Sequence, residues 1–375
     1  MKITFAHMGN LYITVKALLE DLGAEVVVPP MPSKRTLSIG SRYSPEFACL
    51  PLKVNIGNYV EALELGADTI AMAGGVGPCR FGMYGEVQRE ILKALGYEFD
   101  MVIIEPPQGR IRHVLEQVGR LVGRNPMRKY VGAVRLAWAK MTAVDELEKA
   151  AQRARPFERR RGAATSALGS ALKLVDEAAG ISQVRRALEE GQEMLRSVQD
   201  PTPGASRRNP ESPPRIGIVG EVYVVLEPFV NFEVERRLGE MGVLVERSIY
   251  IGDWVKEHVF KDFMRLRKSR RPYDLAKPYL CHFVGGHGVE TVGHTVEYAR
   301  RGFDGVIQLA PFTCMPEIVA QDVLPAVSRD LGIPVMTLVF DEHSSDTGVL
   351  TRLEAFVDLV ERSRRRRRAR DGTMG

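Results

Sequence analysis

The strongest constraint on the fold is a strand–helix–strand order that the chain presents twice. The first copy consists of residues 2–6, Gly9, a helical pattern to about residue 22 and residues 25–28; the second consists of residues 216–219, Gly220, a helical pattern near 229–241 and a run near 244–246. Short apolar runs joined through a helix favour parallel strands, because a crossover is needed to return to the same edge of a sheet.

Later segments repeat the correspondence. Residues 68–75 and 304–310 are apolar runs, and each is followed by a Gly/Pro loop that contains a cysteine and then by a helical pattern. Two further apolar runs, 101–105 and 334–340, follow these helices. The sequence therefore predicts an α/β fold with two Rossmann-like lobes, each with a parallel sheet, and favours a duplicated α/β unit.

A helical section separates the two lobes. The chain from about 136 to 199 is rich in Ala, Arg, Glu and Leu, with an interruption at ARPFERRRGAATS, and five prolines follow within 200–214. We therefore predict an N-terminal lobe at 1–135, a helical insertion or brace at 136–199 and a Pro-rich linker at 200–214. A C-terminal lobe at 215–361 and an Arg-rich tail at 362–375 complete the predicted organisation.

Composition limits the class of protein. The 375 residues are 45% hydrophobic and 26% charged, which is typical of a globular chain. No apolar run approaches the roughly 18 residues of a membrane span, and MKITFAHMGN lacks a signal-peptide pattern, so we expect no membrane association and a cytoplasmic location. The formal charge of +5 comes from the tail, which contributes +6, and we interpret that tail as a solvated helix end rather than a nucleic-acid surface.

Four scattered cysteines do not suit a disulfide framework, and they leave core packing, metal ligation or a catalytic thiol open. Cys49 precedes a predicted helix from Pro51 to about Leu65, whereas Cys79 and Cys314 lie between a strand and the next helix. Backbone N–H groups and the helix dipole stabilise negative charge at such junctions, which favours thiolate ligands of one metal centre. Cys281 lies in KPYLCHFVGGHG without this context, and we interpret it as a packing cysteine, with a fourth ligand as the alternative.

Five segments carry a family resemblance. In order they are CLPLK, GGVGPCRFGMY, GGHGVETVG, PFTCMPEI and DEHSSDTG. They resemble the 2-hydroxyacyl-CoA dehydratase-related iron–sulfur proteins, with the closest likeness to the cysteine-bearing segment of acyl-CoA dehydratase activase-related proteins and their stand-alone homologues. The resemblance spans nearly the whole chain outside the helical section and the Arg tail.

The resemblance implies a [4Fe-4S] cluster held through Cys49, Cys79 and Cys314. Three thiolates leave one iron without a protein sulfur ligand, and in the related double-cubane proteins a sulfide joins two clusters. Gly74, Gly75 and Gly77 would let the backbone approach the cluster closely.

Other polar residues are candidates for substrate chemistry. His287, Glu290 and His294 have helical spacing, and His287 or Glu290 is a candidate acid–base group, with a structural turn as the alternative. Arg80 and Lys53 are candidates for binding an anion, with a surface charge as the alternative. Glu221 and Tyr223 lie just past a strand and have no assigned role. The segment DEHSSDTG (341–348) favours a capping or loop role over a cation site.

Motifs for nucleotides are missing from the sequence. It contains no G-x-x-x-x-G-K-[ST] loop and no G-x-G-x-x-G fingerprint, which predicts no ATPase or NAD site. The resemblance implies an ATP-dependent activator protein as the electron donor and leaves the enzymatic role open between an acyl-CoA dehydratase (lyase) and a double-cubane-type reductase. The alternative is a non-catalytic partner subunit of an activase system. A homodimer or a related second subunit also remains open.

Overall fold

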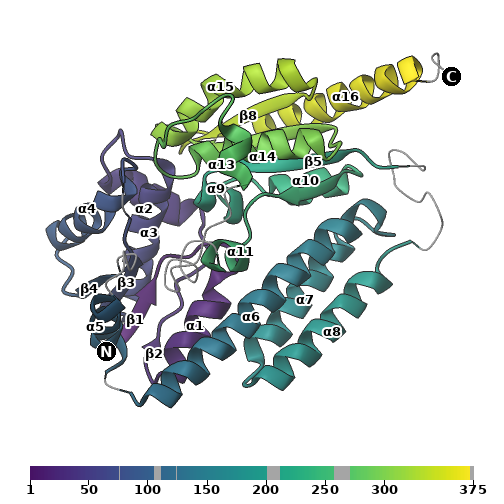
Figure 1. The fold of residues 1–375 in the computed structure, drawn as a ribbon. Coiled ribbons are helices and arrows are strands. Elements are labelled where there is room, and N and C mark those ends of the chain that lie inside the picture. The colour runs from purple at the N-terminus through teal and green to yellow at the C-terminus, as the bar shows by residue number, and fades with distance from the viewer. Residues whose placement is uncertain (76, 105–110, 124, 201–211, 257–270, 372–375) are drawn as a thin grey trace. The chain divides into compact units, whose positions relative to one another are not determined.

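The computed structural model describes residues 1–375 with the exception of 76, 105–110, 124, 201–211, 257–270 and 372–375. It contains two four-stranded, all-parallel sheets with the strand orders β2-β1-β3-β4 and β6-β5-β7-β8 (Figure 1). In both sheets the two strands that come first in the sequence form one half of the sheet, and the two that come later form the other half. The predicted α/β class with two Rossmann-like lobes is confirmed, and the two lobes share one strand order.

The first sheet is covered by helices on both faces. Its strands are β1 (Lys2–Phe5), β2 (Glu25–Val26), β3 (Thr69–Ala73) and β4 (Asp100–Ile104); its helices are α1 (Leu11–Asp21), α2 (Lys34–Tyr43), α3 (Leu50–Glu64), α4 (Phe81–Ala94) and α5 (Ile111–Val122). Ile70 and Met72 pack with α3 and α4, whereas Ala71 packs with Leu19 of α1 and Leu121 of α5. This alternation follows the two-residue period of a strand.

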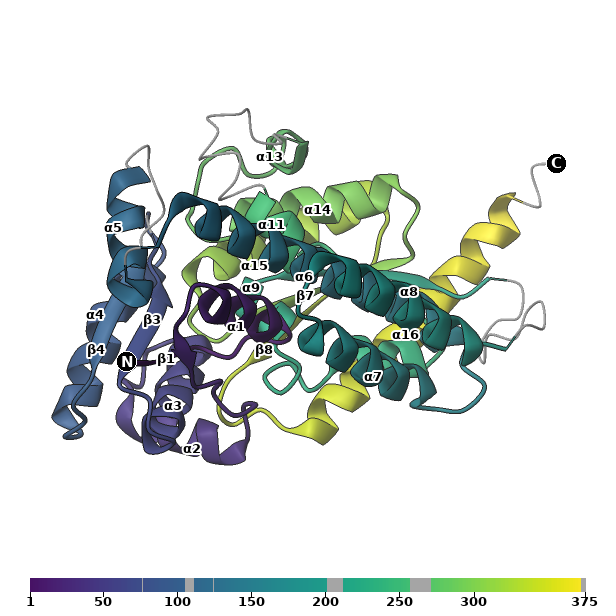
Figure 2. The ribbon, with the colours of Figure 1, turned by 90° about the horizontal axis from the view of Figure 1, so that it is seen from below.

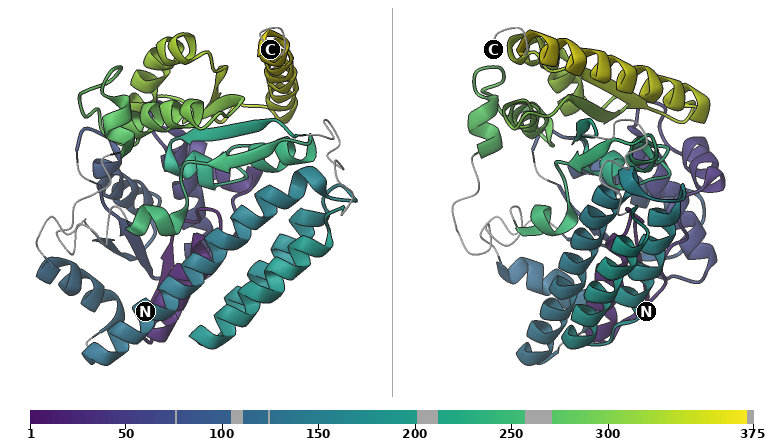
Figure 3. Two further views of the ribbon diagram at one scale, coloured as in Figure 1. Left: turned by 45° about the vertical axis from the view of Figure 1, so that its right-hand side comes forward. Right: turned by 90° about the vertical axis from the view of Figure 1, so that its right-hand side faces the viewer.

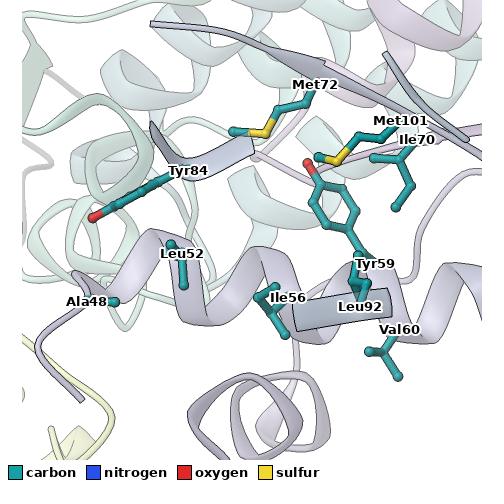
Figure 4. Close-up of a cluster of buried hydrophobic side chains, with 10 residues drawn as sticks. All are labelled: Ala48, Leu52, Ile56, Tyr59, Val60, Ile70, Met72, Tyr84, Leu92 and Met101. Carbon is teal, nitrogen blue, oxygen red and sulfur yellow. The ribbon is translucent and has the colours of Figure 1, made fainter. Parts of the chain in front are cut away.

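The helix α3 lies in the centre of the first lobe. Every residue from Leu50 to Ala62 is buried, and Figure 4 shows Leu52, Ile56 and Tyr59 in the core cluster that also contains Met72 and Met101. On another face α2 crosses α3 so closely that a Cβ atom on Gly57 would lie 1.9 Å from the Thr36 carbonyl oxygen. Helix α3 is thus held by a sheet on one side and by a backbone contact on the other.

The second sheet has the same layered construction. Its strands are β5 (Arg215–Gly220), β6 (Leu244–Arg247), β7 (Gly305–Pro311) and β8 (Val335–Phe340); the helices of this part are α9 (Val222–Leu226), α10 (Val234–Glu240), α13 (Arg271–Ala276), α14 (Gly288–Arg300), α15 (Met315–Leu331) and α16 (Asp346–Asp371). Gly217 of β5 lies against the Tyr298 ring of α14, whereas Gly305 of β7 lies against Val360 of α16. Helices α14 and α16 therefore cover opposite faces.

The helix predicted near 229–241 is shorter in the structure. Phe232 and Glu233 adopt left-handed backbone conformations, with φ of 55° and 56°, and α10 begins only at Val234. The Asn231 side chain stabilises this turn, because its amide donates to the Val224 carbonyl at 2.7 Å and its oxygen accepts from the Val234 N–H at 3.3 Å. The apolar pattern predicted the helix, but it could not predict the left-handed turn that precedes it.

The helical section consists of α6 (Met127–Ala154), a 3-10 turn η1 (Arg155–Phe157), α7 (Ala163–Glu177) and α8 (Ile181–Ser197), and these helices lie side by side (Figures 1 and 2). The break between α6 and α7 falls at the predicted interruption. A Cβ atom on Gly191 of α8 would lie 2.6 Å from the Ala171 Cβ and 2.7 Å from Leu147 Cδ2, so the three helices pack tightly there.

Buried ion pairs join the end of α6 to the second lobe. Glu235 of α10 accepts a hydrogen bond from Gln152 at 2.8 Å and pairs with Arg155 of η1, and Arg247 Nε of β6 lies 3.3 Å from it. Arg247 also pairs with Glu148 of α6. Although burial opposes it, the Arg247 and Arg155 guanidinium groups lower the pKa of Glu235. Each of these charged side chains therefore has a partner of opposite charge inside the protein.

The described chain forms two compact units, and each contains one sheet and part of the helical section. Residues 173–188 and the short helix α11 (Ile251–Val255) belong with the first sheet, where the Gly252 N–H donates to Asp145 Oδ2 at 2.7 Å. Residues 146–172 and 189–249 belong with the second sheet. Among the helices of the described residues, none is both long and apolar enough to cross a membrane.

Most of the Arg-rich segment continues the last helix. Helix α16 extends through the arginines to Asp371 as one continuous helix (Figure 3). Arg364 Nε lies 3.1 Å from Asp304 Oδ1 and its Nη1 donates to the Ser212 carbonyl at 3.0 Å, and Arg367 also pairs with Asp304. The interpretation of this segment as solvated is therefore wrong for Arg364, whose side chain is 12% exposed, but it holds for Arg367, whose side chain is exposed. Residues 201–211 of the predicted linker and 372–375 of the tail lie outside the described residues.

Candidate site at the carboxyl edges of the two sheets

The three cysteines of the predicted ligand set share one kind of position. Cys49 is the N-cap of α3, Cys79 directly precedes the Arg80 N-cap of α4, and Cys314 is the N-cap of α15. A crossover helix runs opposite to its parallel strands, so each of these starts lies at the carboxyl edge of its own sheet, where α/β proteins bind ligands. All four cysteines of the chain are free thiols.

Two contacts join the start of α3 to the first turn of α4. The Tyr84 hydroxyl lies 2.8 Å from Cys49 Sγ, and the Arg80 guanidinium donates to the Phe47 carbonyl oxygen at 3.2 Å. Figure 4 shows the Tyr84 ring directed toward the Ala48 end of α3. Because Arg80 follows Cys79 directly, these contacts bring the Cys49 and Cys79 loops to the same edge of the first sheet.

The Tyr84 hydroxyl holds its proton more tightly than a solvent-exposed tyrosine does. Burial, followed by the charge and hydrogen bond of Cys49, raises the pKa of Tyr84. A protonated phenol can donate to a thiolate, and a hydrogen bond to an ionised acceptor is stronger than one between neutral groups. Tyr84 is therefore a hydrogen-bond partner of Cys49 that the sequence did not reveal, because the motif GGVGPCRFGMY pointed to its cysteine, its glycines and Arg80.

The predicted glycines shape the loop between β3 and α4. The Gly74 N–H donates to the Ile104 carbonyl at 2.8 Å, and a Cβ atom on Gly75 would lie 2.6 Å from the Phe81 ring. Gly77 has φ of 108°, a conformation that side chains rarely adopt. The loop therefore folds tightly against the first turn of α4, immediately before Cys79.

Lys53 differs from its expected place. The alternative to anion binding was a surface charge, but Lys53 is only 3% exposed, one turn after Cys49 in α3. Its aliphatic stem and its charge are inside the first lobe, so the surface interpretation is wrong.

In the second lobe, the start of α15 is built on an unusual backbone turn. Thr313 has φ of 64°, and the following Cys314 is 7% exposed, with its carbonyl accepting from the Ile318 N–H at 2.9 Å. The GGHG loop packs against this turn so closely that a Cβ atom on Gly288 would lie 2.4 Å from the Pro316 carbonyl oxygen. The Gly-rich loop and the Cys314 turn thus lie together at one edge of the second sheet.

The structure brings together two of the three polar residues of the GGHG segment. His287 is the N-cap of α14, and its Nε2 lies 3.8 Å from Glu290 Oε2. His294 instead pairs with Glu297, at 3.3 Å between Nδ1 and Oε2. His287 and Glu290 remain candidates for acid–base chemistry, whereas His294 belongs to an ion pair on the helix.

A buried glutamate, Glu317, is the main residue that the sequence did not point to. It is 1% exposed, and its carboxylate accepts from Thr291 Oγ1 at 3.1 Å and from Gln308 Nε2 at 2.8 Å. A glutamate three residues after an N-cap is ordinarily a capping residue, so its sequence position gave no signal. Only the fold places Gln308 of β7 and Thr291 of α14 beside it.

Glu317 has an unusual electrostatic environment. Burial, followed by the charges of Glu221 and Glu290, raises the pKa of Glu317 to about 7, against the hydrogen bonds from Gln308 and Thr291. Glu221 is itself the N-cap of α9 and accepts the N–H groups of Tyr223 and Val224. Burial raises the pKa of Glu221, and those two backbone hydrogen bonds oppose it.

The DEHSSDTG segment and Cys281 are the remaining sequence candidates. Asp341 Oδ1 accepts from the His343 N–H at 3.0 Å and from the Ser344 hydroxyl at 2.9 Å, which is the loop role expected for this segment. Cys281 is exposed, so its interpretation as a packing cysteine is wrong.

The donor set fits an iron–sulfur centre in chemical type. Within the part of the chain that the structure describes, no group of three or more His, Cys, Asp or Glu side chains is arranged to hold a metal ion. Cys49 and Cys79 belong to one compact unit and Cys314 to the other. Each is a free thiol at a helix start, where the N–H groups and the dipole favour an anionic ligand such as a thiolate.

A comparison of the chain with models of known protein families gave no match, and neither did a comparison with curated proteins.

Proposed function

We propose that the chain is a cytoplasmic iron–sulfur protein that accepts a low-potential electron and passes it to a bound substrate. A [4Fe-4S] cluster held by Cys49, Cys79 and Cys314 would supply one-electron transfer and one iron without a protein sulfur ligand. Acyl-CoA dehydration and small-molecule reduction are the two reaction classes that the sequence resemblance leaves open.

The placement of the three thiols carries the proposal. Each lies at the start of a helix on the carboxyl edge of a parallel sheet, and none is in a disulfide. A cysteine that only fills space is more often found within a strand or on the inner face of a helix. Three of four cysteines at anion-stabilising helix starts therefore favour ligation.

The chain's own residues would position and tune such a centre. The Tyr84 hydroxyl lies 2.8 Å from the Cys49 sulfur and would donate to it as a thiolate, and Arg80 fixes the loop that precedes Cys49 through the Phe47 carbonyl. Hydrogen bonds to a ligating sulfur withdraw electron density and raise the reduction potential. In the second lobe, His287 and Glu290 lie near the same sheet edge as Cys314 and would hold or transfer a proton there.

Iron content is the direct test. We expect about four irons and about four acid-labile sulfides per chain after anaerobic purification or reconstitution. Cys49→Ala, Cys79→Ala and Cys314→Ala should each lower that content strongly, whereas Cys281→Ala, at an exposed thiol, is the matched control and should retain it. A chain that binds neither iron nor sulfide under these conditions would rule out the electron-transfer function.

A partner subunit without turnover is the second candidate. Two large apolar side chains beside the cysteines of the first lobe, Phe47 and Met83, are each 68% exposed, which is typical of a surface that meets another molecule. On this alternative, an ATP-dependent activator protein would bind tightly and in a nucleotide-dependent way without turnover. Binding of an acyl-CoA to the isolated chain would favour the enzyme instead.

A further inference from the structure

The carboxyl group of Glu317 is buried without a compensating cation. Within the described residues no arginine or lysine pairs with it, and its partners are the neutral side chains of Gln308 and Thr291. Glu235, in the same compact unit, shows the ordinary solution, in which a buried carboxylate faces two arginines and its pKa is lowered. Glu235 and Glu317 thus differ within one unit, because the first is matched by arginines and the second pairs with no cation among the described residues.

The hydrogen bonds around Glu317 are fixed from three elements. The Thr337 hydroxyl of β8 donates to Gln308 Oε1 at 2.8 Å, which turns the amide nitrogen of Gln308 toward Glu317. That nitrogen donates to both Glu317 Oε2 and the Glu317 carbonyl, at 2.8 and 3.0 Å. The carboxyl group is thus held in one place whether or not it carries a proton, because Thr291 can act as donor or acceptor.

The charged neighbours of Glu317 are mainly acidic. Glu221 faces it from the start of α9 and Glu290 from α14, and both raise its proton affinity. Glu290 in turn has two partners: His287 Nε2 lies 3.8 Å away, and the Tyr273 hydroxyl of α13 hydrogen-bonds to it. Burial first, and then the charges of these carboxyl groups, raise the pKa of Glu317 to about 7, so the site is partly protonated at neutral pH.

Glu317 is also close to Cys314 along the helix. It follows the Cys314 N-cap by three residues, which is an axial rise of about 4.5 Å. Charges a few ångströms apart in a poorly solvated place interact strongly. Negative charge at residue 314 must therefore change the proton affinity of Glu317, and a proton on Glu317 must in turn favour that charge.

We propose that Glu317 binds one proton from solvent when negative charge is added at Cys314, and releases it when that charge is removed. This inference rests on the proposed function only in naming an iron–sulfur centre as the source of the charge. At such a centre the added electron would come from the external low-potential donor, and the proton would come from water. The only bond that would form on Glu317 is the O–H bond of its carboxyl group. Glu317 is accordingly a positioning and charge-compensating residue, because it acts through Cys314.

The proton itself can be observed without any metal. Infrared spectra of the full chain, kept metal-free by chelation, should show a protonated-carboxyl C=O band that disappears as the pH rises through about 7. Glu317→Gln should remove this band, and Glu354→Gln, at an exposed glutamate of α16, should leave it unchanged. Thr291→Val, which removes one hydrogen bond to the ionised form, should move the midpoint to higher pH.

The coupling to residue 314 is tested by an isosteric pair. Cys314→Asp places a carboxylate at the N-cap and Cys314→Asn a neutral amide, and both residues are good N-caps. We expect the proton affinity of Glu317 to be about tenfold higher in the Asp variant than in the Asn variant. Equal midpoints in the two variants, or a neutral-pH band that survives Glu317→Gln, would overturn the proposal. Neither measurement uses iron, so a chain that binds no iron would defeat the proposed function and leave this result standing.

Discussion

Tyr84 and Glu317 occupy corresponding places in the two lobes. Each lies in the first turn of the helix that follows the third strand of its sheet, and each reaches back to the beginning of the preceding helix, at Cys49 and Thr291 respectively. The partners are 35 and 26 residues away in the chain. Side-chain pairs at such separations are set by the fold, which is why neither contact could be predicted from local sequence.

The Tyr84 hydroxyl should stabilise the first lobe and restrain Cys49. Tyr84→Phe removes one hydrogen bond to sulfur, and we expect a loss of about 1 kcal/mol in the free energy of unfolding and faster alkylation of Cys49. Urea unfolding and thiol-modification rates in the metal-free chain measure the two effects. Tyr130→Phe, whose hydroxyl contacts the Gly123 carbonyl, is the matched control and should not change the alkylation rate.

Glu317 should make stability fall between acid and neutral pH. The pKa of Glu317 is raised from the ordinary glutamate value of 4.5 to about 7, so the folded chain binds the proton more tightly than the unfolded chain does. The stabilisation is complete below about pH 4.5 and is lost as the pH rises through about 7, a change of about 3 kcal/mol at most. Comparing the pH dependence of urea midpoints for the wild type and Glu317→Gln checks this. A parallel pH profile in both proteins contradicts it.

At the scale of elements, the crossing of α2 and α3 depends on missing side chains. Gly40 and Gly57 each face backbone of the other helix, at 1.7 Å from the Lys53 oxygen and 1.9 Å from the Thr36 oxygen for an added Cβ. Backbone atoms this close cannot yield as a flexible side chain can. The two helices must therefore separate if either glycine is replaced.

Two glycine substitutions distinguish the effect of this close contact on stability from the effect of helix propensity. Gly57→Ala should destabilise the chain by about 2 kcal/mol or more, because it forces the two helices apart. Gly132→Ala in α6, where nothing lies within 4 Å of the added Cβ, should stabilise it by about 0.5–1 kcal/mol. In thermal or urea unfolding, the change in the free energy of unfolding should therefore have opposite signs in the two variants. A Gly57→Ala variant that is more stable than the wild type would refute the close crossing.

The elements show where sequence reasoning succeeds. The apolar runs at 68–75 and 334–340 contain β3 and β8, and the run at 101–105 covers β4 except for its first residue, Asp100, because buried parallel strands are continuous hydrophobic segments. Helix α10 begins later than its pattern suggested, since a left-handed turn at Phe232 and Glu233 precedes it. The ion pair between Arg364 of α16 and Asp304, 60 residues earlier in the chain, is a contact that no local pattern reveals.

At the scale of the whole molecule, the helical section belongs to the compact units rather than lying outside them. In the second unit the link is ionic, because Glu148 and Arg155 pair with Arg247 and Glu235 across about 80 to 100 residues of chain. The sequence predicted this section and its break, since helix propensity and interruption are local. It could not predict which charged residues would be buried together.

Removing one member of this network should be costly. Arg247→Met leaves two buried carboxylates, Glu148 and Glu235, with fewer partners, and we expect a loss of about 3–5 kcal/mol in the free energy of unfolding. Arg196→Met, which removes an exposed pair with Glu193 on α8, should cost no more than about 0.5 kcal/mol. Urea unfolding compares the two variants directly. Equal and small losses would show that the buried network contributes little.

Because both sheets have the same strand order, each offers the same two helix beginnings, one before and one after its third strand. In the first lobe both carry sulfur, at Cys49 and Cys79; in the second, an imidazole at His287 takes the earlier place and Cys314 the later one. The strand order is thus repeated in the two sheets, whereas the donor atoms are not. At these helix beginnings the difference between the lobes is chemical, with a nitrogen in place of a sulfur at His287.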